Sequence, residues 1–159
     1  MTASRTGAIS LATALFTMGG VHWVMAESPA PGVQWHVSAS RASLDLSAVV
    51  PQGWHVYALH QAVGGPTPLL VSLDVGARAR VIGAPSGTVP KTRHDPSFDL
   101  KTSYYTNDFI LSFPIRLQGA LEDSPTLPVS VRFQLCSEHE CQPPKTVHLI
   151  APVEPAHST

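Results

Sequence analysis

The sequence has no cluster of basic residues and little charge of either sign, since only 13% of its 159 residues are charged. Its lysines and arginines are scattered along the chain, which argues against a nucleic-acid footprint and against binding to anionic membrane surfaces. Gly-rich phosphate loops, G-x-S-x-G elbows and H-E-x-x-H runs are also missing, so hydrolases are unsupported. Proteins or small molecules remain as partners.

Long apolar runs are missing as well. The stretch from Ala8 to Met18 is shorter than the roughly 20 residues that span a bilayer. It follows Arg5 and precedes Val24-Met25-Ala26, which together have the three-part layout of a secretory signal. We therefore expect a signal peptide over residues 1–26 that is cleaved after Ala26. The mature protein is expected to be periplasmic and not inserted in the membrane.

Helical patterns are nearly absent from the mature region, where no window of ten or more residues combines a 3.6-residue period with freedom from Pro and Gly. Strict alternation of apolar residues runs instead through Phe109 to Leu117 and again through Val129 to Leu135. Residues 91–108 form a polar stretch with embedded aromatic residues. Seven or so short strands at intervals of roughly 10 to 15 residues predict an all-β protein with an immunoglobulin-like antiparallel β-sandwich.

The composition predicts one compact domain, because 43% of the residues are hydrophobic. We place this domain at residues 33–152. A flexible Pro-rich lead is expected at residues 27–32 and a disordered tail at residues 153–159. We expect the protein to be a monomer.

Only two cysteines are present, Cys136 and Cys141. Export to an oxidising compartment makes a disulfide between them the default state. They lie at the junction of two predicted strands, where a tight connection would bring their Cα atoms near the roughly 5.5 Å that a disulfide needs. Closing so short a loop stabilises a fold by only about 2 kcal/mol, so the position weakly favours redox chemistry over a structural role.

The surroundings of the cysteines do not activate them. Glu138 and Glu140 disfavour a thiolate, whereas His139 would favour it if protonated. We therefore expect the oxidised pair to be attacked by a partner's thiolate and to pass electrons on after reduction. Two cysteines and one nearby histidine fall short of a zinc site, and no cofactor is predicted.

These residues resemble a family, the N-terminal periplasmic domain of the DsbD thiol:disulfide interchange proteins, also called the disulfide bond corrector family. The specific match is Cys136-x4-Cys141-Gln142-Pro143-Pro144. Supporting segments are Gly53 to Tyr57, Gly65 to Pro68 and Tyr105 to Leu117. Together these segments cover nearly the whole mature chain.

The resemblance implies a protein-disulfide reductase that relays electrons from a thioredoxin-like donor to periplasmic acceptor proteins, with Cys141 forming the mixed disulfide. It also implies a cap loop from Asp95 to Asp99, in which Phe98 shields the bond. Family members usually continue into a membrane electron-transfer domain and a thioredoxin domain. Because this chain stops at Thr159, the donor is expected to be another polypeptide.

Several alternatives stay open at this point. Trp54, His55 and Tyr57 either border the cysteines or belong to the core, and Phe98 is either a cap or an ordinary core or edge residue. His139 either tunes the thiols or faces solvent. The protein as a whole could instead be a non-catalytic exported binding module with a structural disulfide. A third reading is a copper-handling protein, in which the cysteines would be joined by His55, His60, His94 and His139.

Overall fold

The computed structural model describes residues 32–119 and 125–154, and these residues form strands and loops without a helix. Within them there is accordingly no helix that could cross a membrane. The predicted signal peptide lies outside the described residues. The strands are β1 (Gln34–Ala39), β2 (Ser43–Val49), β3 (His55–Tyr57), β4 (Leu70–Leu73), β5 (Ala79–Val81), β6 (Ser86–Gly87), β7 (Lys91–Asp95), β8 (Leu100–Tyr105), β9 (Phe109–Leu117), β10 (Thr126–Phe133), β11 (Leu135–Cys136) and β12 (Lys145–Pro152).

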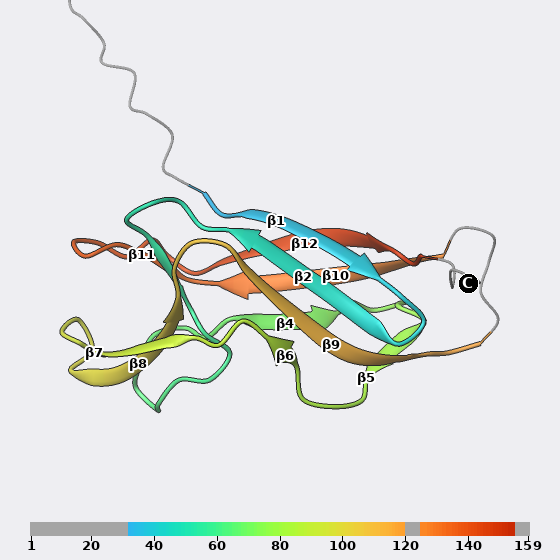
Figure 1. The fold of residues 1–159 in the computed structure, drawn as a ribbon, viewed down its shortest axis with the longest axis horizontal. Helices are drawn as coiled ribbons and strands as arrows, with labels where there is room; N and C mark the ends of the chain where they lie inside the picture. The colour runs from blue at the N-terminus through green and yellow to red at the C-terminus, as the bar shows by residue number, and fades with distance from the viewer. Residues whose placement is uncertain (1–31, 120–124, 155–159) are drawn as a thin grey trace, which may run out of the picture.

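The strands form antiparallel sheets that pack as layers. One sheet has the order β1-β2-β9-β5, with β6 also paired to β9, and a second has the order β12-β10-β4. A third sheet, β11-β3-β8-β7, extends from one end of this sandwich. Figure 1 shows the β7–β8 hairpin and the loop that leads into β12 at that same end. The architecture confirms the predicted all-β antiparallel fold.

The core lies between the layers and follows the period-two pattern of the sequence. Phe109, Leu111, Phe113 and Ile115 of β9 are buried, while the residues between them are half-buried or exposed. β2 and β10 alternate in the same way. Each large apolar side chain buried in this way stabilises the fold by about 1.5–3 kcal/mol relative to exposure. The strand predicted over Phe109 to Leu117 is confirmed.

The polar stretch at residues 91–108 contains a hairpin, β7–β8, that the apolar pattern did not predict. Its inward positions include Asp95 and Thr102, which are 2% and 1% exposed. Polar residues at buried positions hide the alternation that marks a strand. With β6 and β11, which are only two residues long, this hairpin also explains why the described residues hold twelve strands instead of seven or so.

The two residues after β12 lie alongside β1. Val153 is buried and forms a parallel bridge with Ala39. The amide of Glu154 donates to the carbonyl of Ala39 at 2.8 Å. Val153 and Glu154 therefore continue the chain from β12 along β1.

Candidate redox site

Cys136 lies where the chain changes from one sheet to another. β10 ends at Phe133, which pairs with Lys145 of β12. Two residues later, Leu135 and Cys136 pair with Val56 and His55 of β3. This switch places Cys136 in the interior, where it is 1% exposed.

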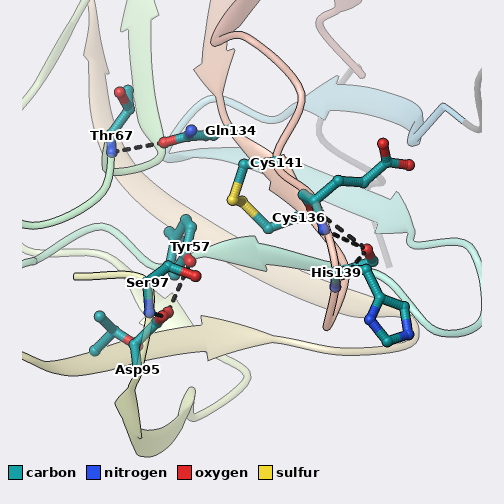
Figure 2. The surroundings of a disulfide bond; sticks show 11 residues. Tyr57, Thr67, Asp95, Ser97, Gln134, Cys136, His139 and Cys141 are labelled. Carbon is teal, nitrogen blue, oxygen red and sulfur yellow. Dashed lines mark hydrogen bonds between the residues drawn. A yellow bond between two sulfur atoms is a disulfide. The ribbon is translucent and has the colours of Figure 1, made fainter. Parts of the chain in front are cut away.

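Cys136 and Cys141 form the predicted disulfide, which closes the cysteine loop (residues 136–141). The two residues lie opposite each other in an antiparallel bridge, with their Cα atoms 4.1 Å apart. This distance is shorter than the expected 5.5 Å because Cys136 and Cys141 form a non-hydrogen-bonded pair of an antiparallel ladder, in which the Cα atoms lie closest together. Cys141 is exposed, unlike Cys136. Figure 2 shows the disulfide between the cysteine loop and Tyr57.

Hydrogen bonds within the cysteine loop fix its shape. The amide of Ser137 donates to the carbonyl of Glu140 at 2.8 Å, and the hydroxyl of Ser137 accepts from the amides of His139 and Glu140, each at 3.1 Å. At its base, the amide of Gln142 donates to the carbonyl of Leu135 at 2.9 Å. The backbone around the bond is therefore held by these hydrogen bonds in addition to the disulfide.

Asp95 and Tyr57 form a buried polar pair beside the disulfide. The Tyr57 hydroxyl donates to Oδ2 of Asp95 at 2.7 Å, and the amide of Ser97 donates to Oδ1 at 3.0 Å (Figure 2). Burial alone would raise the pKa of Asp95, but these bonds and the positive charge of Arg93 outweigh it and hold the pKa below its usual value. Burial and the bond to Asp95 raise the pKa of Tyr57. At neutral pH Asp95 is thus ionised and Tyr57 is protonated.

Phe98 lies in the turn between β7 and β8, the cap turn (residues 95–99). Its ring is half-buried and meets the ring of Tyr57 edge-on, with centroids 5.9 Å apart. The turn is closed by the amide of Phe98, which donates to the carbonyl of Asp95 at 3.3 Å, and by the positive φ of Asp99. The structure thus brings Phe98, Asp95 and Tyr57 together.

His55 is directly opposite Cys136 in the pairing of β3 with β11, and it is 4% exposed. The turn immediately before β3, which positions His55, contains Gly53, whose positive φ of 79° suits glycine. Its ring packs edge-on against Tyr57 and Tyr104, at 5.0 and 5.2 Å between centroids. Burial, assisted by the charge of Arg93, lowers the pKa of His55, so the imidazole is neutral at neutral pH.

His139 is separated from this cluster. It is exposed, and Figure 2 shows its ring directed away from the disulfide. Its acidic neighbour Glu138 accepts a hydrogen bond from Nη1 of Arg93 on β7 at 2.5 Å. This bond lowers the pKa of Glu138.

Two long-range contacts of the site had no signal in the sequence pattern. The first is the ion pair of Arg93 and Glu138, which joins β7 to the cysteine loop. The second joins Gln134 to the loop after β3, since its side-chain oxygen accepts from the amide of Thr67 at 3.0 Å (Figure 2). The first contact joins residues 45 positions apart and the second joins residues 67 positions apart. A single polar residue in the sequence does not indicate so distant a partner.

The histidines considered for copper do not gather around the cysteines in the described residues, which contain no group of three or more His, Cys, Asp or Glu side chains placed to hold a metal. His94, for example, lies 3.1 Å from a carboxylate oxygen of Asp99 at the cap turn, and both side chains are exposed.

A family model described as the thiol:disulfide interchange protein DsbD, N-terminal, matches residues 24–151. The chain belongs to this family. The match spans the cysteine loop, the cap turn and all twelve strands except the last residue of β12, and it confirms the resemblance seen in the sequence. No curated protein matches the chain.

Solved structures of DsbD N-terminal domains have the same fold. The domain of Neisseria meningitidis in its reduced form is 14% identical, with a TM-score of 0.55 over 74% of this chain and 82% of that chain. A chain from the complex between the DsbD N-terminal and PilB N-terminal domains of Neisseria meningitidis is also 14% identical, with a TM-score of 0.54 over 83% of this chain and 94% of that chain. The immunoglobulin-like fold is thereby confirmed.

Proposed function

We propose that this protein is a periplasmic thiol:disulfide interchange module that relays electrons through Cys136 and Cys141 from a thioredoxin-like donor to acceptor proteins. The observation that carries the proposal is the asymmetry of the disulfide, because Cys141 is exposed at one end of the sandwich while Cys136 is buried. A purely structural bond has no need of one exposed cysteine. Membership in the DsbD N-terminal family supports the same reading.

Exchange begins when a thiolate of the donor attacks the sulfur of Cys141. The bond between Cys141 and Cys136 breaks, a mixed disulfide joins the donor to Cys141, and Cys136 leaves as a thiolate that takes up a proton. The second thiolate of the donor then attacks the donor's own sulfur in the mixed disulfide. The donor ends as a disulfide, and the pair has gained two electrons and two protons.

Delivery to an acceptor runs through the same sulfur. The thiolate of Cys141 attacks the acceptor's disulfide, and Cys136 then attacks Cys141 to release the reduced acceptor and restore the internal bond. In this sense the protein acts as a protein-disulfide reductase. The complex of the related Neisseria domain with a PilB domain supports a role that depends on docking to another protein domain.

Phe98 shields the bond in this proposal, and Asp95 holds the turn that carries it. The support is geometric, since the ring of Phe98 lies against Tyr57, while Asp95 is bonded to both Tyr57 and Ser97. Tyr57 and His55 form the wall behind the bond. His139 faces solvent, where it is available to a docked partner. The protein acts as a monomer that meets its partners one at a time.

The reduction potential of the disulfide tests this proposal. Equilibration of the protein with glutathione buffers is expected to give a potential above about −300 mV, the region of exchangeable bonds. A lower potential would mark a structural bond and leave a non-catalytic binding module as the better description. The reduced and oxidised forms can be separated after thiol alkylation by the shift in mass.

A further inference from the structure

A hollow in the surface lies beside the cysteine loop, on the side of Glu138. It is a cavity of ≈ 320 Å³ bordered by the turn before β3, by β7 and by the end of β8. Its volume falls at the lower end of the range for small-molecule sites, about 300–1,000 Å³. Trp54 supplies an aromatic wall, and Lys91 supplies an exposed ammonium group.

Three buried polar atoms that lack a hydrogen-bond partner belong to side chains lining this one cavity. They are Nε2 of His55, Nε of Arg93 and Oγ1 of Thr106. Among the described residues only one other buried polar side-chain atom, Nε1 of Trp35, also lacks a hydrogen-bond partner. Buried polar groups in folded proteins nearly always pair with protein, water or a ligand, so a cluster of three at one cavity marks a place where a polar ligand would find hydrogen-bond partners.

The chemistry of these groups selects a ligand with acceptor oxygens. An arginine Nε is only ever a donor, and the Nη1 of Arg93 is already occupied by Glu138. The hydroxyl of Thr106 can donate beside it, and a lysine ammonium is likewise only a donor. Lys91 and Arg93 together outweigh the single carboxylate of Glu138, so the cavity carries one net positive charge.

We propose that this cavity binds a small molecule bearing a carboxylate group. The carboxylate accepts from Nε of Arg93 and from the hydroxyl of Thr106, the ammonium of Lys91 lies at the rim, and the ring of Trp54 packs against the rest of the molecule. The third unpaired atom, Nε2 of His55, lies in the inner wall and donates to the same ligand in the Nε2–H tautomer of the neutral imidazole. The site uses no sulfur chemistry, so it stands independently of electron relay.

The test is a titration of the ¹⁵N-labelled, oxidised protein with sodium acetate and sodium benzoate, followed by nuclear magnetic resonance. Sodium chloride at the same ionic strength is the control. We expect saturable shifts of the Arg93 Nε–H, Thr106 and Trp54 signals with a Kd in the millimolar range or tighter. Benzoate should bind more tightly than acetate because its ring can pack against Trp54.

Substitutions of residues that line the cavity test whether the carboxylates bind there. Thr106→Val, which keeps the side-chain shape, should weaken binding about tenfold, as expected for a hydrogen bond to a charged group. Lys91→Gln should weaken it about threefold, as expected for an exposed ion pair. Lys101→Gln is the matched control, because it removes the same charge from the same hairpin outside the cavity.

Shifts that do not saturate, shifts that chloride reproduces, or equal effects of Lys91→Gln and Lys101→Gln would each overturn the proposal. Circular dichroism establishes that Thr106→Val is folded. If that variant does not fold, the exposed Lys91 still decides the outcome, since its removal leaves the core intact.

Discussion

The hydroxyl of Tyr57 donates to Oδ2 of the buried Asp95 at 2.7 Å, and this bond ties the strand beside the disulfide to the turn that carries Phe98. Asp95 is ionised in this arrangement, and its pKa lies below the usual range. The folded protein therefore takes up a proton at Asp95 less readily than the unfolded chain does. This difference makes the stability of the fold depend on pH.

The first prediction concerns acid unfolding. Because the pKa of Asp95 is depressed in the folded state, its contribution to stability is present above the unfolded pKa of about 3.9 and is lost as the pH falls through the folded pKa. Urea unfolding followed by circular dichroism between pH 7 and pH 2 should show this loss in the original protein. Asp95→Asn should flatten the pH dependence in that window.

Two variants complete this experiment. Tyr57→Phe should destabilise the fold at pH 7 by about 1–3 kcal/mol, since it removes a hydrogen bond to a charged, buried group. Asp99→Asn changes an exposed carboxylate in the same turn and should leave the pH dependence in place. A curve for Asp95→Asn as steep as that of the original protein would show that Asp95 is not the titrating group.

The second prediction concerns shielding by Phe98. Phe98→Ala should accelerate reduction of the disulfide by dithiothreitol severalfold, because access of the attacking thiolate governs the rate. Phe98→Leu keeps an apolar side chain at the same place and should retain most of the protection. The rates are measured by quenching with an alkylating reagent at timed intervals.

Thermal unfolding of both Phe98 variants separates shielding from general loosening of the fold. If Phe98→Ala is reduced at the original rate, then Phe98 does not protect the bond and is an ordinary packing residue against Tyr57.

The third prediction concerns the ion pair that joins β7 to the cysteine loop. The bond from Arg93, followed by its charge, lowers the pKa of Glu138. In Arg93→Gln the pKa of Glu138 should therefore rise toward its ordinary value, which a titration of the carboxyl ¹³C signal measures. Arg132→Gln removes an exposed charge on β10 and serves as the control. An unchanged Glu138 titration in Arg93→Gln would mean that the pair does not persist in solution.

The fourth prediction concerns the reduced state. The cysteine loop is closed by its own backbone hydrogen bonds, and a six-residue ring is too short for its disulfide to constrain the unfolded chain strongly. Reduction should therefore lower the free energy of unfolding by only about 2 kcal/mol. Urea unfolding with and without a phosphine reductant measures the difference. Loss of the folded state on reduction would identify the bond as a structural requirement.

The sequence pattern predicted the fold where apolar residues define it. β9 shows strict alternation from Phe109 to Leu117, and every second residue from Phe109 to Ile115 is buried. The sequence pattern did not predict β7 and β8. Two of their buried positions are occupied by the polar residues Asp95 and Thr102, so no apolar alternation marks these strands.

The sequence predicted the two cysteines of the site, but it predicted fewer of the contacts that surround them. The short spacing of Cys136 and Cys141 limits them to a local bond, and the flanking Gln142-Pro143-Pro144 carries the family resemblance. The ion pair of Arg93 and Glu138 could not be predicted from the sequence. The two residues are 45 positions apart, and their pairing depends on the β7–β8 hairpin.

The most direct test of electron relay is to trap the mixed disulfide. Cys136→Ser leaves Cys141 free, and Cys141→Ser leaves Cys136 free. Each variant is incubated with a thioredoxin-like protein that keeps only its attacking cysteine, activated as a mixed disulfide with thionitrobenzoate, which leaves as the thiolate, and the products are resolved on a non-reducing gel. We predict a covalent complex with Cys136→Ser and little or none with Cys141→Ser, because only Cys141 is exposed. Complexes formed only by Cys141→Ser would reverse the two roles, and no complex with either variant would contradict the proposed exchange.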